Sequence, residues 1–212
     1  MHIIFGGTFD PIHHGHLRLA VELRERFGVA SVALVPAHIP PHRDQPGTTS
    51  AERLRLLELA IEGEPGLVID DRELSREGAS YSADTLRQLR QELGAQAPLA
   101  MVVGTDAFAA FDQWYEWQAI PSLAHIIVVN RPGSQLDPSS QAARLLASRA
   151  AEAPSQLLSR PAGLCLALDL PLLAISASGI RERIQAGRSP RYLLPDAVWR
   201  EIRGKELYVG GP

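Results

Sequence analysis

The sequence predicts an α/β protein with an open, doubly wound, Rossmann-like sheet that is mostly parallel and carries helices on both faces. One observation predicts this fold class, and a second predicts where its functional site lies. Short apolar runs alternate with amphipathic helical segments along the chain, as expected when crossover helices join parallel strands. Glycine, histidine, aspartate and arginine residues also gather at or after the expected strand ends, at residues 6–10, 36–43, 104–106 and 176–181. Ligands of such sheets bind beyond those ends, so we expect the functional site there.

The first strand covers residues 2–5 and stops at a Gly-Gly pair. A helix is expected over residues 15–27, because Leu19, Leu23 and Phe27 recur every four residues and form one buried stripe. The glycine that follows at position 28 is expected to end this helix. Residues 31–36 then form the second strand.

A loop rich in proline and polar residues follows the second strand as far as Thr49. Thr49 and Glu52 have capping-box spacing, which predicts that the next helix starts there. The expected buried face of this helix consists of Leu54, Leu57 and Ile61, and its expected stop is Gly63. A short strand is expected over residues 67–70.

In the middle of the chain, residues 82–93 are expected to form a helix that Gly94 ends. The buried stripe of this helix should consist of Leu86, Leu89 and Leu93. A strand over residues 99–103 follows, and residues 114–120 have a helical pattern that Pro121 should end. The next strand covers residues 125–129.

The last third begins with an alanine-rich surface helix over residues 138–150 and a loop over residues 151–163. The last strand covers residues 164–168, and helices over 178–186 and 195–203 close the sequence. No repeat, low-complexity tract or linker interrupts this order. We therefore interpret residues 1–212 as a single domain.

Composition narrows the function classes. The chain has 212 residues, 45% of them hydrophobic, and a formal net charge of −3. This charge supplies no overall basic field for a nucleic acid, so no nucleic-acid partner is expected. Cys165 is the one cysteine, and its apolar neighbours favour a buried structural thiol. The sequence shows neither a signal-peptide pattern nor an apolar run of about 20 residues, so we expect a cytoplasmic protein without a membrane partner.

The most informative motif follows the first strand, and it reads Gly-Gly-Thr-Phe-Asp-Pro-Ile-His-His-Gly-His from Gly6 to His16. Two glycines let the backbone turn sharply and approach a ligand closely. Their N–H groups and the start of the next helix make a natural anion site. His13 and His16 lie three positions apart across the helix start, so both can contact one phosphate group. A zinc site is the alternative use of this pair, but a zinc ion would need further ligands.

A second motif follows the last strand and reads Ile-Ser-Ala-Ser-Gly-Ile-Arg from Ile175 to Arg181. Ser178 is expected to cap a helix. Arg181 would then lie in the first turn, where a cation is unfavourable beside the positive helix end unless an anion lies between them. Taken alone, this is an ordinary capped helix, but together with the first motif it predicts a phosphate site.

The two motifs resemble those of the adenylyltransferases of the nucleotidyltransferase superfamily. The complete first motif is similar, more narrowly, to that of the bacterial nicotinate-mononucleotide adenylyltransferases. Further matches are Pro40-Pro41-His42-Arg43, Tyr81-Ser82-x-Asp84-Thr85-Leu86, Gly104-x-Asp106, Trp114-Tyr115-x-Trp117 and Arg131-Pro132-Gly133. The family usually has Ser-Ser-Thr where this chain has Ser176-Ala177-Ser178, so one hydroxyl that could contact phosphate is missing.

This resemblance implies an enzyme of NAD biosynthesis that transfers AMP from ATP to nicotinate mononucleotide and releases pyrophosphate. The acceptor phosphate would attack directly in line, without a covalent intermediate. Mg²⁺ would be bound to the phosphates, and no dedicated protein metal site is expected. The helical segment 178–204 would complete the ATP site.

From the residue types, the catalytic groups should be His13, His16 and Arg181, with His16 at the α-phosphate and Arg181 at the β- and γ-phosphates. ATP is expected to contact Gly6, Gly7, Thr8, Phe9, His13, His16, Gly104, Asp106, Ile175, Ser178 and Arg181. The mononucleotide is expected to contact Thr8, His42, Thr85, Trp114, Tyr115 and Arg131. By resemblance, Trp114 would stack on the pyridine ring, and backbone N–H groups near Thr85 and Tyr115 would hold its carboxylate.

Three alternatives stay open. The acceptor could be nicotinamide mononucleotide or phosphopantetheine, although the Trp114 and Arg131 segments are not expected in enzymes for the latter. The chain could bind nucleotide without catalysis, although His13, His16 and Arg181 are all present. It could also be a fragment of a class I aminoacyl-tRNA synthetase, but no Lys-Met-Ser-Lys-Ser-like loop occurs. The alanine-rich outer helix could serve a homo-oligomer interface or only cover the sheet.

Overall fold

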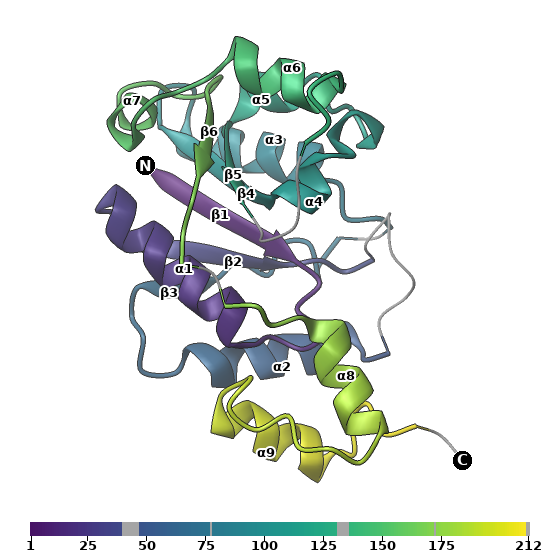
Figure 1. Ribbon diagram of the computed structural model, residues 1–212. Coiled ribbons are helices and arrows are strands. Elements are labelled where there is room, and N and C mark those ends of the chain that lie inside the picture. Colours follow the sequence, from purple (N-terminus) through teal and green to yellow (C-terminus); the bar gives the residue numbers. More distant parts are fainter. Residues whose placement is uncertain (40–46, 77, 131–135, 172, 211–212) are drawn as a thin grey trace.

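The computed structural model describes residues 1–39, 47–76, 78–130, 136–171 and 173–210 (Figure 1). Six strands form one sheet in the order β3-β2-β1-β4-β5-β6, and every pair of neighbours is parallel. The strands are β1 (His2–Gly7), β2 (Val32–Pro36), β3 (Leu67–Ile69), β4 (Leu99–Gly104), β5 (His125–Val129) and β6 (Cys165–Leu168). The predicted α/β class with a parallel, Rossmann-like sheet is confirmed.

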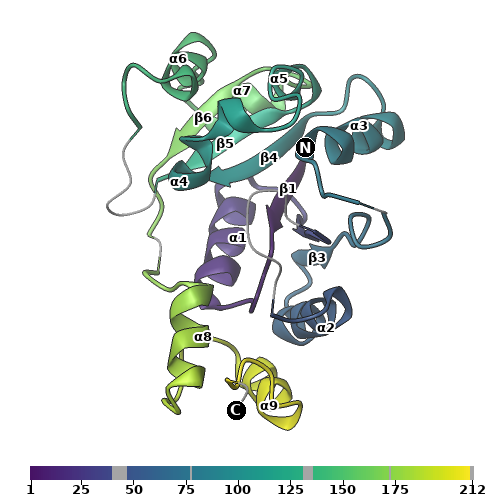
Figure 2. The ribbon, with the colours of Figure 1, turned by 90° about the vertical axis from the view of Figure 1, so that its right-hand side faces the viewer.

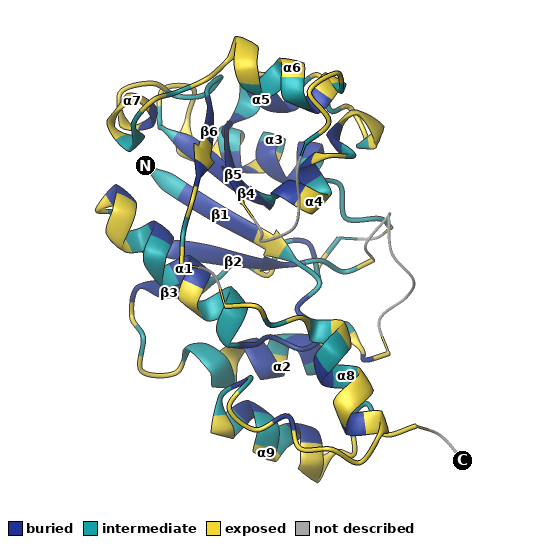
Figure 3. Cartoon of the chain, viewed as in Figure 1, coloured by how far each residue is buried: buried dark blue, intermediate teal, exposed yellow. Residues whose placement is uncertain are grey.

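Helices connect the strands and cover the sheet. Those in the first half are α1 (His14–Phe27), α2 (Ser50–Ile61), α3 (Ser82–Leu93), α4 (Thr105–Phe108) and the 3₁₀ helix η1 (Phe111–Gln113). Those in the second half are α5 (Ile120–Leu123), α6 (Gln141–Ser148), α7 (Pro154–Leu158), α8 (Ala177–Gln185) and α9 (Asp196–Gly204). Figure 3 shows β2, β4 and β5 mostly buried, whereas the helices expose their outer faces.

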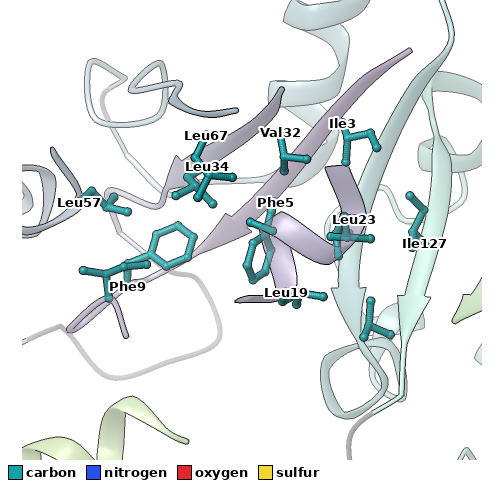
Figure 4. Packing of buried hydrophobic residues seen from close by; sticks show 14 of the residues in the cluster. Ile3, Phe5, Phe9, Leu19, Leu23, Val32, Leu34, Leu57, Leu67 and Ile127 are labelled. Carbon is teal, nitrogen blue, oxygen red and sulfur yellow. The ribbon is translucent and has the colours of Figure 1, made fainter. Parts of the chain in front are cut away.

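Alternate residues of each strand point to opposite faces of the sheet, and the core is divided accordingly. On one face, Ile3 and Phe5 of β1 pack with Leu19 and Leu23 of α1, as Figure 4 shows. On the other face, the intervening Ile4 belongs to a second cluster that contains residues of α3, α4, η1, α5 and α6. Figure 2 shows α1 and α3 on opposite sides of β1.

The strand order places a switch point between β1 and β4. The chain proceeds from β1 outward to β2 and β3, and then returns to β4 beside β1. The helix after β1 covers one face, whereas α4 and η1 after β4 contribute Phe108 and Phe111 to the other face. The connections therefore diverge between these two strands, and a crevice at their carboxyl ends is where such sheets bind ligands.

Helices α8 and α9 lie beyond the carboxyl-terminal edge of the sheet, and α9 lies next to α2 (Figures 1 and 2). They are attached by apolar residues, because Ile180 and Ile184 of α8 and Val198 and Ile202 of α9 join the same core cluster as α1. This packing brings the second sequence motif next to the loop that follows β1. Among the described helices, none has the length and apolarity that a membrane span requires.

Three helix predictions were wrong in detail. Residues 114–119 form a bend and turns, not a helix, and Pro121 is the second residue of the next helix, α5. Proline suits the first turn of a helix, where its missing N–H is not needed. The segment 151–163, expected to be a loop, contains the short helix α7, and the helix expected over 138–150 is confined to α6.

The buried face of α2 was predicted correctly only at Leu57. Its buried residues are Arg53, Leu56 and Leu57, whereas Leu54 and Ile61 are only half-buried. The expected start of α2 is confirmed, because Thr49 accepts a hydrogen bond from the Glu52 N–H in a complete capping box. The stripe is rotated because the helix buries an arginine, which an apolar pattern does not reveal.

Candidate active site

The loop after β1 is held in a strained and tightly packed form. Phe9 has a φ of 51°, in the left-handed region that a bulky residue adopts only where its surroundings require it. Its ring is 2% exposed and packs edge-on against His16, with ring centroids 5.1 Å apart. A side chain at Gly7 would place its Cβ 3.0 Å from the Phe9 ring. Glycine at this position therefore makes the packing of Phe9 possible.

The two histidines of the first motif stack on each other. Their ring centroids are 3.6 Å apart and their planes differ by 21°. His13 is buried and is the N-cap residue of α1, while His16 is half-buried in its first turn. A Cβ at Gly15 would lie 3.0 Å from the His13 ring, so glycine is needed there for the stack. His13 and His16 therefore lie side by side at the start of α1.

Asp10 links this loop to the carboxyl-terminal part of the chain. Its carboxylate is buried, and Oδ1 accepts hydrogen bonds from the Thr48 hydroxyl at 2.5 Å and the Tyr208 hydroxyl at 2.7 Å. Arg181 donates from Nη1 to the main-chain oxygen of Asp10 at 2.6 Å, and the same nitrogen lies 3.6 Å from Oδ2. The two predicted motifs therefore meet, because Arg181 contacts a residue three positions before His13.

The start of α8 differs from the prediction. Ser176, not Ser178, is the N-cap residue, and its hydroxyl accepts a hydrogen bond from the Gly179 N–H at 3.1 Å. Ser178 lies exposed in the first turn and donates to the Ser176 hydroxyl at 3.3 Å. Arg181 is the fifth residue of α8, two positions further from the helix start than expected, so its guanidinium reaches Asp10 from the side of the helix.

The carboxyl end of β4 carries the predicted ribose contact. Gly104 ends β4 and is the N-cap residue of α4, and Asp106 follows exposed in the first turn. Thr105 is buried between them and donates to the main-chain oxygen of Val129 at 3.1 Å, which ties β4 to β5. Gly104 and Asp106 thus lie on the β4 side of the switch point, and Gly6 and Gly7 lie on the β1 side.

Three of the predicted mononucleotide contacts, Thr85, Trp114 and Tyr115, lie in or near the first half of α3. The Tyr115 ring packs at a tilt of 31° against Tyr81, the N-cap residue of α3, with ring centroids 4.4 Å apart. Trp114 is half-buried and packs against Phe111 at 5.3 Å. The loop after β2 joins the same region, because the Ser80 hydroxyl accepts a hydrogen bond from the His38 N–H at 2.9 Å. The loop after β2, the start of α3 and the segment after η1 therefore lie together.

Thr85 was expected to contact the substrate, but it is buried and forms hydrogen bonds within the protein. It is 1% exposed, and its hydroxyl donates to Glu73 at 2.6 Å. Its N–H donates to the main-chain oxygen of Tyr81. Burial raises the pKa of the Glu73 carboxyl, while the hydrogen bond from Thr85 opposes this shift. Both polar groups of Thr85 are thus used within the protein. The other two predicted contacts, His42 and Arg131, lie outside the described residues.

Comparison with known proteins places the chain in a family. The family model described as cytidylyltransferase-like matches residues 4–183. A relative from Marinobacter nauticus, named a probable nicotinate-nucleotide adenylyltransferase, is 62% identical over all of this chain and 98% of its own length. A relative of the same name from Cellvibrio japonicus is 48% identical over 97% of each chain.

The chain belongs to the nicotinate-nucleotide adenylyltransferases, within the cytidylyltransferase-like family. The fold agrees with this assignment. The structure of the nicotinic acid mononucleotide adenylyltransferase from Plasmodium falciparum, complexed with NaAD, matches with a TM-score of 0.74. The match covers 97% of this chain and 96% of that one, at 16% sequence identity.

For this adenylyltransferase, the sequence did not indicate several residues that build the site. Arg53 is 1% exposed and donates to the main-chain oxygens of Thr8, at 2.9 Å, and of Ala37, at 2.6 Å. It thereby joins the loops after β1 and β2. Arg53 stands in an otherwise ordinary amphipathic helix, and Tyr208 stands in the tail after α9. The one feature of the sequence that indicated burial of Arg53 was its place on the same helical face as Leu56 and Leu57.

Proposed function

We propose that this adenylyltransferase joins ATP and nicotinate mononucleotide, giving deamido-NAD and pyrophosphate. Membership of the nicotinate-nucleotide adenylyltransferases over the whole chain supports this proposal. The structural observation that best supports the proposal is the hydrogen bond from Arg181 to the main-chain oxygen of Asp10, three positions before His13. This contact holds Arg181 against the loop that leads to the two imidazoles, near the switch point of the sheet, and this supports a site for a polyanion.

In the proposed reaction, a phosphate oxygen of the mononucleotide attacks the α-phosphorus of ATP. The bond between that phosphorus and the oxygen bridging to the β-phosphate breaks, and pyrophosphate leaves with the electron pair. Two anions must meet, so positioning and neutralisation of charge are the main requirements. His16 would contact the α-phosphate, His13 would bind neighbouring oxygens, and Arg181 would hold the β- and γ-phosphates. No step requires a covalent enzyme intermediate.

The side chains fit a Mg²⁺ ion that is held chiefly by the phosphates. Within the described residues, no three His, Cys, Asp or Glu side chains are grouped so as to hold a metal ion. The buried Asp10 carboxylate already accepts hydrogen bonds from Thr48 and Tyr208. Mg²⁺ usually keeps several waters and binds substrate phosphates with few protein ligands. When bound, it would neutralise phosphate charge that the histidines and Arg181 alone leave unbalanced.

The mononucleotide would bind between Trp114 and the start of α3. Stacking of Trp114 on the pyridine ring and a ribose contact from Asp106 remain our proposals for these two residues. Because both polar groups of Thr85 are engaged, we assign the carboxylate contact to the first turn of α3. The N–H groups of a first turn have no carbonyl partner within the helix and favour an anion.

The test is pyrophosphate release from MgATP with a panel of acceptors. Nicotinate mononucleotide, nicotinamide mononucleotide and phosphopantetheine are compared at equal concentrations. The proposal predicts that nicotinate mononucleotide gives the highest kcat/KM. A higher value with either other acceptor would replace the substrate assignment. No release with any acceptor would favour a nucleotide-binding protein without catalysis.

A further inference from the structure

The tail after α9 reaches the loop that carries the catalytic motif. The Tyr208 hydroxyl donates to Oδ1 of Asp10 at 2.7 Å, across a sequence separation of 198 residues. Thr48 donates to the same oxygen at 2.5 Å. The reaction proposed above uses neither hydroxyl, so the arrangement calls for a separate explanation.

The tail is held against its local preference. Tyr208 has a φ of 63° and Glu206 a φ of 52°, and both lie in the left-handed region, which is unfavourable for residues other than glycine. Tyr208 packs against the core cluster on the α1 face. Burial raises the pKa of Tyr208, so its phenol stays protonated and donates its hydrogen. This backbone conformation is therefore stabilised by burial of the ring and by the bond to Asp10.

The two oxygens of the Asp10 carboxylate have different neighbours. Oδ1 receives the two hydroxyls, whereas Oδ2 lies 3.6 Å from Nη1 of Arg181. That distance exceeds the 2.7–2.9 Å of a charge-assisted hydrogen bond. The main-chain oxygen of Asp10 instead accepts from Nη1 at 2.6 Å. Arg181 is thus oriented by Asp10 without being fully paired with its carboxylate, and its side chain keeps 34% of its surface exposed.

The orientation of the carboxylate decides what Arg181 can bind. A buried carboxylate that loses hydrogen-bond donors is strongly unfavourable. Without the hydroxyls on Oδ1, both oxygens can turn toward the guanidinium and form a bidentate pair, the strongest arrangement for these two groups. A guanidinium paired in this way has fewer donors and less net charge for a phosphate.

We propose that Tyr208, together with Thr48, is a positioning residue for the triphosphate of ATP. It holds the Asp10 carboxylate through Oδ1, so that Arg181 keeps its free donors for the β- and γ-phosphates. The tail of the chain thereby sets the affinity for ATP without contacting it. This inference rests on the phosphate-binding role that the proposed function gives to Arg181.

The test compares Tyr208→Phe, which removes one oxygen and keeps the buried ring, with Tyr192→Phe as a matched control. Tyr192 is 82% exposed, in the loop that precedes α9. Calorimetric titration with MgATP in the absence of acceptor measures Kd, and initial rates give KM for each substrate. We expect Tyr208→Phe to raise the Kd and KM for ATP by about tenfold, the effect of one hydrogen bond to a charged group. The KM for nicotinate mononucleotide should stay within about twofold, and the control should match the wild type.

A double-mutant cycle tests whether the effect passes through the carboxylate. In an Asp10→Asn background, no carboxylate remains to capture Arg181, so adding Tyr208→Phe should change the Kd for ATP by less than about twofold. Thr48→Val removes the other hydroxyl from the same oxygen and should weaken ATP binding in the same direction. It replaces Tyr208→Phe as the test if the phenylalanine variant does not fold.

The inference is overturned if Tyr208→Phe binds ATP as the wild type does. It is also overturned if both substrates lose affinity equally, or if the effects of Tyr208→Phe and Asp10→Asn add. A wild-type chain that binds MgATP but releases no pyrophosphate would contradict the proposed function alone. Because the calorimetric Kd needs no turnover, it would still decide the role of Tyr208.

Discussion

The stacked imidazoles of His13 and His16 are the most informative feature at the scale of single residues. With ring centroids 3.6 Å apart, two charged rings would repel each other strongly in a partly buried site. An anion beside them removes this conflict, because it attracts each ring in its protonated form. The pair therefore suits a site where phosphate charge arrives with the substrate and increases in the transition state.

His16→Ala should lower kcat by about 100-fold or more, the effect of losing one preorganised donor to developing charge. His14→Ala is the matched control, because His14 is the neighbouring histidine at the first position of α1. Steady-state pyrophosphate release measures both variants. Near-normal turnover of His16→Ala would remove this residue from the catalytic machinery.

Trp114 and Trp117 offer a second comparison between neighbours. Both contact Phe111, at 5.3 Å and 6.1 Å between ring centroids. Trp114→Ala should raise the KM for the mononucleotide by about tenfold while the KM for ATP changes little, because base stacking on an aromatic ring contributes about 1–3 kcal/mol. Trp117→Ala should reduce stability without this selectivity. Equal effects of Trp114→Ala on both substrates would exclude ring stacking.

At the scale of elements, strands were predicted better than helices. Strands β2 and β5 are buried at every position, and a continuous apolar run marks such strands clearly. Helices α4, α5 and α7 have only four or five residues, too few to show a helical period. The boundary of α8 was displaced because Ser176 and Ser178 are both suitable caps, and only the hydrogen bond to Gly179 distinguishes them.

The cap of α8 gives a prediction at this scale. Ser176→Ala should lower the free energy of unfolding by about 1 kcal/mol, because the Gly179 N–H loses its acceptor. Ser178→Ala, at the exposed neighbouring serine, should change it by less than about 0.5 kcal/mol. Urea denaturation measures both. A larger loss for Ser178→Ala than for Ser176→Ala would contradict the observed cap.

At the scale of the whole molecule, the sheet edge at which the predicted residues after β1 and β4 gather was predictable, but the contacts that join the loops there were not. Parallel strands bring residues after β1 and β4 to one edge whatever the details of the loops. The contact of Tyr208 with Asp10 spans 198 residues, and that of Arg53 with Thr8 spans 45. No local pattern records such pairs, because they depend on how α2 and the tail pack together.

Stability of the whole fold should depend on pH through His125, at the amino end of β5. Its Nε2 donates to the main-chain oxygen of Arg160 at 2.9 Å, and its Nδ1 accepts from the Leu164 N–H at 3.1 Å. Only the neutral ring makes both bonds, and burial lowers the pKa of His125. The unfolded chain therefore binds a proton more readily than the folded chain, so stability should fall as the pH drops below about 6.5.

Urea denaturation between pH 7.5 and 5 tests this dependence. Each extra proton bound by the unfolded chain contributes a slope of about 1.4 kcal/mol per pH unit. His2, whose pKa is also lowered by burial, contributes with the same sign. His125→Gln should reduce the slope even if the variant is less stable at every pH. An unchanged slope would show that His125 does not titrate on unfolding.

The most direct test of the central claim is a crystal structure of the chain with a non-hydrolysable ATP analogue and Mg²⁺. The account predicts one triphosphate at the carboxyl ends of β1 and β4, contacted by the imidazoles of His13 and His16 and by the guanidinium of Arg181. A triphosphate bound elsewhere, or these three side chains directed at no common ligand, would contradict it.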